Sequence, residues 1–223
     1  MLYPVGPPFS AAPTRSPLTA TNIHVWRLQT SETSPRAVSA HGHAALHELL
    51  NYYTGSTQAI AIGHGPHGKP HALHPGSPHF SISHTGGLIL LAFASAQELG
   101  VDIERTTRER PVITLAERFF TAAEAAALVR LPTAERLHAF SALWTCKEAV
   151  LKAVGRGLAF GLDRLEFTLD SSGQPRCLSH IADEAGQVAE WRIQRLQPAP
   201  GHVAALAWRG APRAVHCFDW PDG

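Results

Sequence analysis

The sequence is poor in charged residues and in cysteine, and both shortages exclude classes of protein. Charged residues make up 17% of the 223 residues and the net charge is +1, whereas an average soluble protein has about 25% charged residues. The chain contains no basic tail or run, so it lacks the electrostatic footprint of a nucleic-acid-binding protein. Its cysteines, Cys146, Cys177 and Cys217, stand far apart, which argues against a disulfide framework and a cysteine zinc site.

Long apolar runs are also missing. The longest is 88–94, far shorter than the roughly 18 residues of a membrane-spanning helix, so we expect no membrane association. Residues 1–20 contain five prolines and one arginine. They hold no apolar stretch of signal-peptide length, and we interpret them as an irregular, Pro-rich leader. The expected compartment is the cytoplasm.

The chain does contain enough apolar residues, 44% of the total, to bury a core without disulfides. Apolar runs predict a strand after Asn22, two strands within 79–95 joined at 85–87, a strand at 100–104 and further strands from residue 165 onward. The run 88–94 is apolar enough to be buried on both faces. Helical spacing predicts helices at 44–53 and 134–154, and the pattern Thr121-x-x-Glu124 predicts the start of another.

The order of one strand, one helix and a pair of strands recurs loosely in the two halves of the sequence. We therefore predict an α+β fold with two similar α/β subdomains in tandem. After the leader at 1–20, the N-terminal subdomain is expected at 21–100 and the C-terminal subdomain at 101–223.

Two acidic residues share one face of the predicted strand GVDIE. Because side chains alternate along a strand, Asp102 and Glu104 project to one side while Val101 and Ile103 project to the other. Neighbouring carboxylates repel each other unless a proton, a cation or water lies between them, and they suit Mg²⁺ when further oxygen ligands are near. The alternative is the exposed polar face of an edge strand.

The predicted helix 134–154 carries charge beside its apolar face. At about 100° per residue, an apolar arc includes Leu137, Phe140, Leu143, Trp144, Leu151 and Val154. Lys147 falls in the middle of this arc, where a lysine needs an anion or a route to water. Glu148 and Lys152 lie along its border. The alternative interpretation is a surface ion pair between Glu148 and Lys152, with the Lys147 stem extending past the core.

Five motifs in order carry a resemblance to a known family. They are GKP at 68–70, SISHTGG at 81–87, GVDIE at 100–104, RFFTAAE at 118–124 and WTCKEAVLKAVGRGL at 144–158. Together they resemble the 4′-phosphopantetheinyl transferases, in particular the larger, surfactin-synthetase-activating type. The G-V-D-I-E and W-x-x-K-E-A-x-x-K motifs are jointly specific, because two unrelated patterns must occur in order at a fixed separation.

The resemblance implies an enzyme that transfers the phosphopantetheine arm of coenzyme A to a serine of an apo acyl or peptidyl carrier protein and releases adenosine 3′,5′-bisphosphate. It implies that Asp102, Glu104 and Glu148 hold a Mg²⁺ ion that also binds the coenzyme A pyrophosphate. Glu148, or a water on the metal, then takes the serine proton, and Lys152 stabilises or protonates the departing phosphate oxygen. Lys147 adds positive potential to the coenzyme site.

The resemblance also implies the remaining contacts with coenzyme A. Gly68, Lys69, Pro70, Ser83 and His84 are expected at its phosphates. In the first helical region the family usually carries basic residues for the 3′-phosphate, whereas this chain has His41, His43 and His47. We therefore assign the 3′-phosphate to His43, with Arg36 as the nearest permanent cation. Since histidine loses its charge near neutral pH, binding of the 3′-phosphate is predicted to weaken as pH rises from about 6 to 8.

Family members of this length are monomers with two pseudo-symmetric halves and an active site in the cleft between them, and the same is implied here. Two alternatives remain open. One is a Mg²⁺-dependent phosphohydrolase that uses the same carboxylates to direct water. The other is a non-catalytic, metal-binding relative, because six histidines fall in one Gly- and Pro-rich segment, which otherwise reads as a polar loop. They are His64, His67, His71, His74, His79 and His84.

Overall fold

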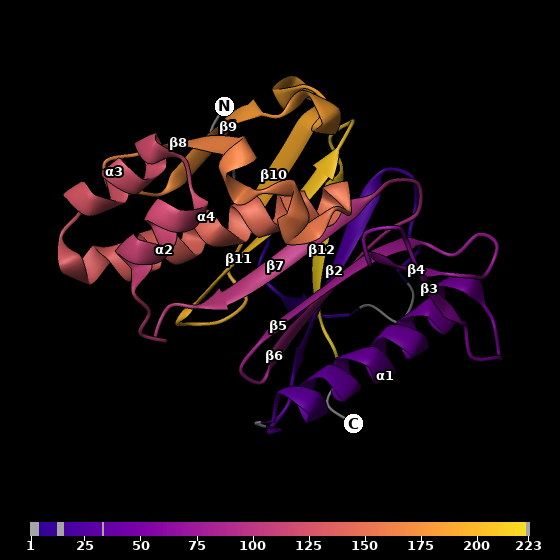
Figure 1. The fold of residues 1–223 in the computed structure, drawn as a ribbon. Coiled ribbons are helices and arrows are strands. Elements are labelled where there is room, and N and C mark those ends of the chain that lie inside the picture. The colour runs from indigo at the N-terminus through magenta and orange to yellow at the C-terminus, as the bar shows by residue number, and fades with distance from the viewer. Residues whose placement is uncertain (1–4, 13–15, 33, 222–223) are drawn as a thin grey trace.

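The computed structural model of the chain describes residues 5–12, 16–32 and 34–221. The strands are β1 (Ser10–Ala11), β2 (Asn22–Gln29), β3 (Ile62–His64), β4 (Pro70–Ala72), β5 (His79–Thr85), β6 (Leu88–Ala94), β7 (Leu99–Arg105), β8 (Leu165–Leu169), β9 (Pro175–Ile181), β10 (Trp191–Leu196), β11 (His202–Arg209) and β12 (Ala214–Asp219). The α-helices are α1 (Pro35–Thr54), α2 (Val112–Phe119), α3 (Ala122–Arg130) and α4 (Thr133–Val154). Short 3₁₀ helices are η1 (Gly157–Phe160), η2 (Leu162–Arg164), η3 (Asp183–Ala185) and η4 (Val188–Glu190). This arrangement confirms the predicted α+β class (Figure 1). Within the described ranges, no helix is long and apolar enough to cross a bilayer.

The larger sheet carries α1 on one face. Across the described residues its strand order is β1-β12-β2-β6-β5. The helix begins at the N-cap Ser34, whose hydroxyl accepts a hydrogen bond from the Ala37 amide, and Pro35 occupies its first turn. Its apolar side packs on Ile89, Leu91 and Phe93 of β6. The helix starts well before the predicted 44–53. The prediction missed its first turns because the residues preceding Ala44 lack apolar spacing.

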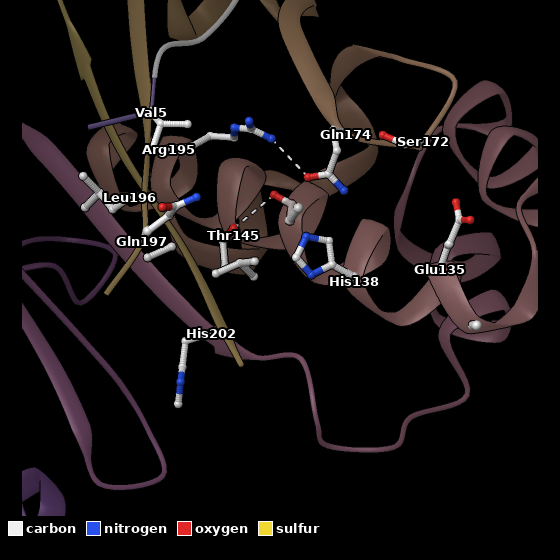
Figure 2. A pocket seen from close by; sticks show the side chains of 14 residues that line it. Val5, Glu135, His138, Thr145, Ser172, Gln174, Arg195, Leu196, Gln197 and His202 are labelled. Carbon is white, nitrogen blue, oxygen red and sulfur yellow. Dashed lines mark hydrogen bonds between the residues drawn. The ribbon is translucent and has the colours of Figure 1, made fainter. Parts of the chain in front are cut away.

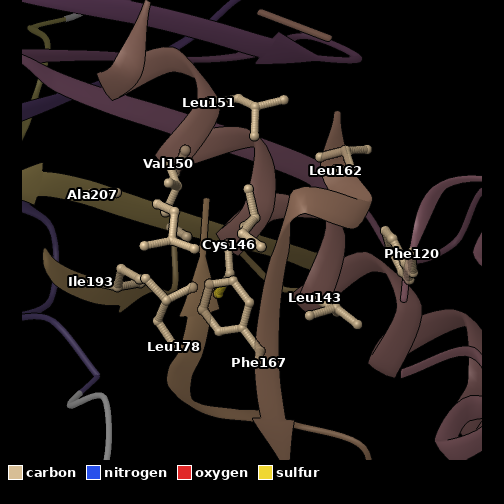
Figure 3. Close-up of a cluster of buried hydrophobic side chains, with 14 of the residues drawn as sticks. Phe120, Leu143, Cys146, Val150, Leu151, Leu162, Phe167, Leu178, Ile193 and Ala207 are labelled. Carbon is tan, nitrogen blue, oxygen red and sulfur yellow. The ribbon is translucent and has the colours of Figure 1, made fainter. Parts of the chain in front are cut away.

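The second sheet supports α4. Its order in the described chain is β10-β11-β7, and both pairings are antiparallel. Figure 1 shows α4 running across these strands, with α2 and α3 packed beside it. The cluster beneath α4 gathers Cys146, Val150 and Leu151 with Phe167 and Leu178 of the β8–β9 hairpin (Figure 3).

A shared apolar cluster joins the two sheets. Leu90 and Ala92 of β6 contribute to it, as do Val101 and Ile103 of β7 and Leu206 of β11. Because the alternate residues of β6 contact α1, this strand is buried on both faces, as predicted. The same alternation confirms that Val101 and Ile103 point away from the acidic face of β7.

A two-residue turn joins β5 to β6 within the predicted junction at 85–87. Thr85 pairs with Leu88, so Gly86 and Gly87 form the turn. Gly86 has φ +58, and a Cβ on Gly87 would lie 2.2 Å from the Thr30 carbonyl oxygen. Glycine is therefore required at this turn by conformation and by space.

The chain ends differ from the predicted organisation. Of the leader at 1–20, residues 1–4 and 13–15 lie outside the described residues, but Ser10–Ala11 forms β1 and pairs with β12. The description of the leader as irregular is wrong for this segment. β12, expected in the C-terminal subdomain, pairs in parallel with β2 of the larger sheet. Short strands that pair across nearly the whole chain leave no local sequence signal.

Candidate active site

The site begins where β7 approaches α4 without a side chain between the two backbones. A Cβ on Gly100 would lie 2.1 Å from the Ala149 carbonyl oxygen and 2.7 Å from Lys152 Cβ. Two and four residues further along the strand, Asp102 and Glu104 therefore lie on the face that α4 covers. The glycine of GVDIE sets the closeness of strand and helix, and the two acids meet the helix for the same reason.

Asp102 is the best-anchored carboxylate of the site and is buried. Its Oδ1 accepts hydrogen bonds from Lys152 Nζ at 2.7 Å and from Ser83 Oγ at 2.8 Å. Its Oδ2 is buried and has no hydrogen-bond partner. An unpaired buried carboxylate oxygen is costly, which makes Oδ2 a position where a cation or a donor would be favourable.

Glu148 adds a third carboxylate from α4. Burial, together with the negative charges of Asp102 and Glu104, raises the pKa of Glu148 to about 7, while Lys152 opposes the shift. The three acids of the two motifs are therefore electrostatic neighbours. Lys152 forms its ion pair with Asp102 and also donates to the Val101 carbonyl at 3.0 Å, so it reaches across to β7.

Glu104 is held by a residue that the sequence did not indicate. Arg110, two residues before the start of α2, donates to both carboxylate oxygens of Glu104, with Nη1 to Oε1 at 3.2 Å. The side chains are 14% and 18% exposed. An arginine in a loop carries no pattern that identifies its partner, so only the folded chain reveals this bidentate ion pair.

The donor set suits a hard divalent cation in its chemistry but is not assembled as a ligand cage. Three carboxylates with one unpartnered buried oxygen are the ligands that Mg²⁺ prefers. However, among residues 5–12, 16–32 and 34–221, no group of three His, Cys, Asp or Glu side chains is arranged to hold a metal ion. Lys152 and Arg110 instead occupy oxygens of Asp102 and Glu104.

The serines of SISHTGG connect β5 to β7. Ser81 Oγ accepts a hydrogen bond from the Val101 amide at 3.0 Å, and Ser83 Oγ donates to Asp102. Both serines are buried. Ser83 was expected at a coenzyme phosphate, which stays a prediction; in this structure its hydroxyl donates to Asp102. The S-x-S spacing, which places both hydroxyls on one face of a strand, was an unused signal for this contact.

The GKP motif lies beside the C-terminal end of α4. Gly68, Lys69 and Pro70 line a pocket of about 210 Å³ together with Lys152 and Gly155. Lys69 Nζ donates to the Leu99 and Ala153 carbonyls, each at 3.2 Å, and forms an ion pair with Glu98. Burial lowers the pKa of Lys69, and Glu98 opposes that shift. The motif thus shares one pocket with the catalytic candidate Lys152.

The remaining coenzyme candidates, His84, His43 and Arg36, are not among the residues that line this pocket. Partial burial and the nearby charges of Lys152 and His43 lower the pKa of His84, which places the two imidazoles and the ammonium in one electrostatic neighbourhood. His43 is exposed on α1, with its Nδ1 3.5 Å from Ser39 Oγ. Arg36 is exposed in the first turn of the same helix.

Lys147 does not belong to the site, and its assignment as a coenzyme-binding residue is wrong. Its side chain is fully buried, and its Nζ lies 2.6 Å from Glu124 Oε2. It also donates to the carbonyls of Leu162 at 2.8 Å and Leu165 at 2.5 Å. Glu124 closes the capping box of α3 with Thr121, as predicted. The anion that a lysine in the apolar arc requires is thus a buried glutamate, and the alternative of a stem passing to water is wrong as well.

A second pocket, of about 510 Å³, lies at the N-terminal half of α4 (Figure 2). Thr145, one turn before Glu148, lines it, as does Arg195, which donates to Gln174 at 3.0 Å. None of the site residues expected from the sequence lines this pocket.

Comparisons with known proteins identify the segment that carries the acids. Residues 98–207 match the family model of the 4′-phosphopantetheinyl transferase superfamily. This segment is therefore similar to that superfamily. The transferase Sfp of Bacillus subtilis is 37% identical over 109 residues, covering 48% of this chain and 47% of that protein. HetI of Nostoc sp., also named a 4′-phosphopantetheinyl transferase, is 33% identical over 131 residues, covering 59% and 52%. The resemblance inferred from the motifs is confirmed.

The match spans about half of each of these transferases, with 47% of Sfp and 52% of HetI covered. The family-model match at 98–207 includes β7, α4 and all three acids, as well as Lys152. The proposed coenzyme residues at 36, 43, 68–70, 83 and 84 precede it. The transferase assignment therefore rests on the acidic half of the site, and the coenzyme half depends on the geometry described above.

Proposed function

We propose that this protein transfers the 4′-phosphopantetheine arm of coenzyme A to a serine of an apo acyl or peptidyl carrier protein and releases adenosine 3′,5′-bisphosphate. The observation that carries the proposal is the meeting of Asp102, Glu148 and Lys152 between β7 and α4, within the segment that matches the transferase superfamily.

The two halves would form a tandem pseudo-dimer with the reaction in the cleft between them. The α1 side would bind the nucleotide, with His43 and Arg36 at the 3′-phosphate, and the 210 Å³ pocket beside Lys69 and Lys152 would take coenzyme phosphate oxygens. Because both halves lie in one chain, we expect a monomer. Coenzyme A and carrier proteins are intracellular, so the proposed compartment is the cytoplasm.

Glu148 is suited to accept a proton at neutral pH. A general base works best when its pKa lies near the operating pH, and in the metal-free protein the pKa of Glu148 is raised to about 7. We assign it the proton of the carrier serine hydroxyl. The serine oxygen then forms the new bond to the phosphorus next to the pantetheine arm, and the bond from that phosphorus to the bridging oxygen breaks.

Lys152 faces the leaving group. Its ammonium is anchored on Asp102 Oδ1 and the Val101 carbonyl, so it presents positive charge at a fixed position where the released phosphate becomes more negative. Asp102, Glu104 and Glu148 would hold Mg²⁺ once Glu104 separates from Arg110. The cation supplies neutralisation of phosphate charge when bound.

The proposal is tested by incubating the protein with coenzyme A, Mg²⁺ and an apo carrier protein, followed by intact mass spectrometry. We expect the carrier to gain the mass of one phosphopantetheine arm. Glu148→Gln should abolish this gain, while Glu135→Gln, an exposed carboxylate on the same helix, should not change it. Release of adenosine bisphosphate without a modified carrier would favour a phosphohydrolase, and binding of Zn²⁺ or Ni²⁺ without turnover would favour the metal-binding alternative.

A further inference from the structure

The ion pair between Arg110 and Glu104 bears on how the site accepts a cation. Glu104 lies on the acidic face of β7, and Arg110 donates to both of its carboxylate oxygens. Bidentate binding uses the oxygens that a metal ion would need. As long as this pair persists, the guanidinium engages one lone pair of each Glu104 oxygen, and a cation bound there would lie next to its positive charge.

The surroundings make this pair strong but incompletely satisfied. Both side chains are largely withdrawn from water, which strengthens their attraction. The Arg110 Nε is buried and has no hydrogen-bond partner. Leaving a buried donor unpaired costs free energy. The ion pair with Glu104 therefore leaves one donor of Arg110 unsatisfied, a cost that is removed when the arginine moves to water.

The backbone of Arg110 is constrained, so movement of its side chain is the way to separate it from Glu104. Arg110 precedes Pro111, and a residue before proline is restricted to extended conformations. Its carbonyl also accepts a hydrogen bond from the Val112 amide at 2.8 Å, at the start of α2. Arg110 is thus fixed at its Cα, and rotation about its side-chain bonds is the simplest way to free Glu104.

The charges of the site point the same way. Three carboxylates, Asp102, Glu104 and Glu148, face two cationic side chains, Lys152 and Arg110. A divalent cation added beside both of these would leave an excess of positive charge. A divalent cation that replaces Arg110 and leaves Lys152 in place would instead balance the three carboxylates.

We propose that Arg110 is an internal competitor for the divalent cation, which holds Glu104 in the metal-free protein and leaves it when the cation binds. This inference rests on the proposed function in one respect, the use of Glu104 as a ligand. Arg110 is a positioning residue, because it acts through Glu104 and touches no substrate. Removing it should tighten cation binding, the opposite of the loss expected for a ligand or a structural support.

The test measures Mn²⁺ binding alone, by the loss of the free-ion electron paramagnetic resonance signal, in the wild type, Arg110→Ala and Arg108→Ala. Arg108 is exposed in the same loop, so its removal subtracts the same charge without freeing Glu104. We expect Arg110→Ala to bind Mn²⁺ about 10-fold more tightly, the effect of losing one charge-assisted contact of about 1.4 kcal/mol, and Arg108→Ala to bind as the wild type does.

A double variant makes the test specific. In the Glu104→Gln background, the substitution Arg110→Ala should have no further effect on Mn²⁺ affinity, because the competition runs through the Glu104 carboxylate. Equal tightening in Arg108→Ala would reduce the effect to general charge and overturn the proposal. Unchanged or weaker binding in Arg110→Ala would overturn it too, even if the wild type modifies carrier proteins. Absence of Mn²⁺ binding in every variant, together with failed transfer, would reject the proposed function itself.

Discussion

Lys147 Nζ lies 2.6 Å from Glu124 Oε2 in the core beneath α4, where the lysine side chain is 0% and the glutamate side chain 1% exposed. Glu124 also accepts hydrogen bonds from the amides of Thr121 and Phe167. The pair therefore ties the start of α3 and the β8 strand to α4. A lysine of the W-x-x-K-E-A-x-x-K motif thus supports the fold, while its neighbour Glu148 lies close to the charges of Asp102 and Glu104.

Replacing Lys147 with methionine should strongly destabilise the protein. The variant leaves Glu124 as an uncompensated buried charge, and breaking such a pair costs about 3–5 kcal/mol. Urea denaturation followed by tryptophan fluorescence measures the change in the free energy of unfolding. The double variant Lys147→Met with Glu124→Gln removes both charges and should recover part of the loss. Wild-type stability combined with weakened coenzyme A binding in the single variant would restore the ligand role that was first expected.

Gly100→Ala should separate β7 from α4. The new Cβ would stand 2.1 Å from the Ala149 carbonyl oxygen, and backbone atoms on both sides cannot move without disturbing the core. Overpacking of this kind costs about 1–3 kcal/mol, and we expect the upper end. Thermal unfolding measures this cost, with Gly65→Ala as a control, because the nearest atom to its Cβ is 3.7 Å away. If Gly100→Ala melts like the control, the close approach of strand and helix is not what the glycine provides.

The titration of Glu148 should appear in stability as well as in activity. Its pKa is raised from 4.5 to about 7, so the folded protein binds this proton more tightly than the unfolded chain does. The resulting stabilisation is complete below pH about 4.5 and is lost as pH rises through about 7. Without divalent cations, we expect the wild type to lose stability relative to Glu148→Gln between pH about 5 and 8. Urea unfolding of both proteins across this range checks the difference, and a constant difference would contradict the raised pKa.

Coenzyme A binding should weaken as the pH rises through the pKa of His84. That pKa is lowered from 6.5, so the imidazole is charged only in acidic solution and its attraction for phosphate is lost as pH increases. Isothermal titration calorimetry at pH about 5.5 and 7.5 should show tighter binding at the lower pH in the wild type. His84→Gln should show a smaller change, while His138→Gln, an exposed histidine on α4, should retain the wild-type change. An identical pH response in His84→Gln and the wild type would remove His84 from the phosphate site.

The sequence predicted the parts of the structure that depend on local periodicity. The alternation in GVDIE assigned Val101 and Ile103 to the core and the acids to the opposite face, because one residue of slippage would bury charge. The capping box of α3 and the glycine turn between β5 and β6 were predicted for similar reasons.

Contacts between distant residues were not predictable from one sequence. The helical periodicity of 134–154 indicated that Lys147 needs an anion. Nothing in the neighbouring sequence indicated that Glu124, the capping residue of α3, supplies it. The partnership of Arg110 with Glu104 and that of Ser83 with Asp102 were missed because each depends on how loops and strands converge after folding.

The position of β12 has a consequence for biosynthesis. This strand lies between β1 and β2 in the larger sheet, so until residues 214–219 have left the ribosome the β2 edge exposes unpaired amides and carbonyls. The earlier strands β2, β5 and β6 must therefore wait, with their sheet unfinished, for a strand that is translated much later. Shortened translation products that stop before residue 214 should accordingly be the species most exposed to aggregation and proteolysis.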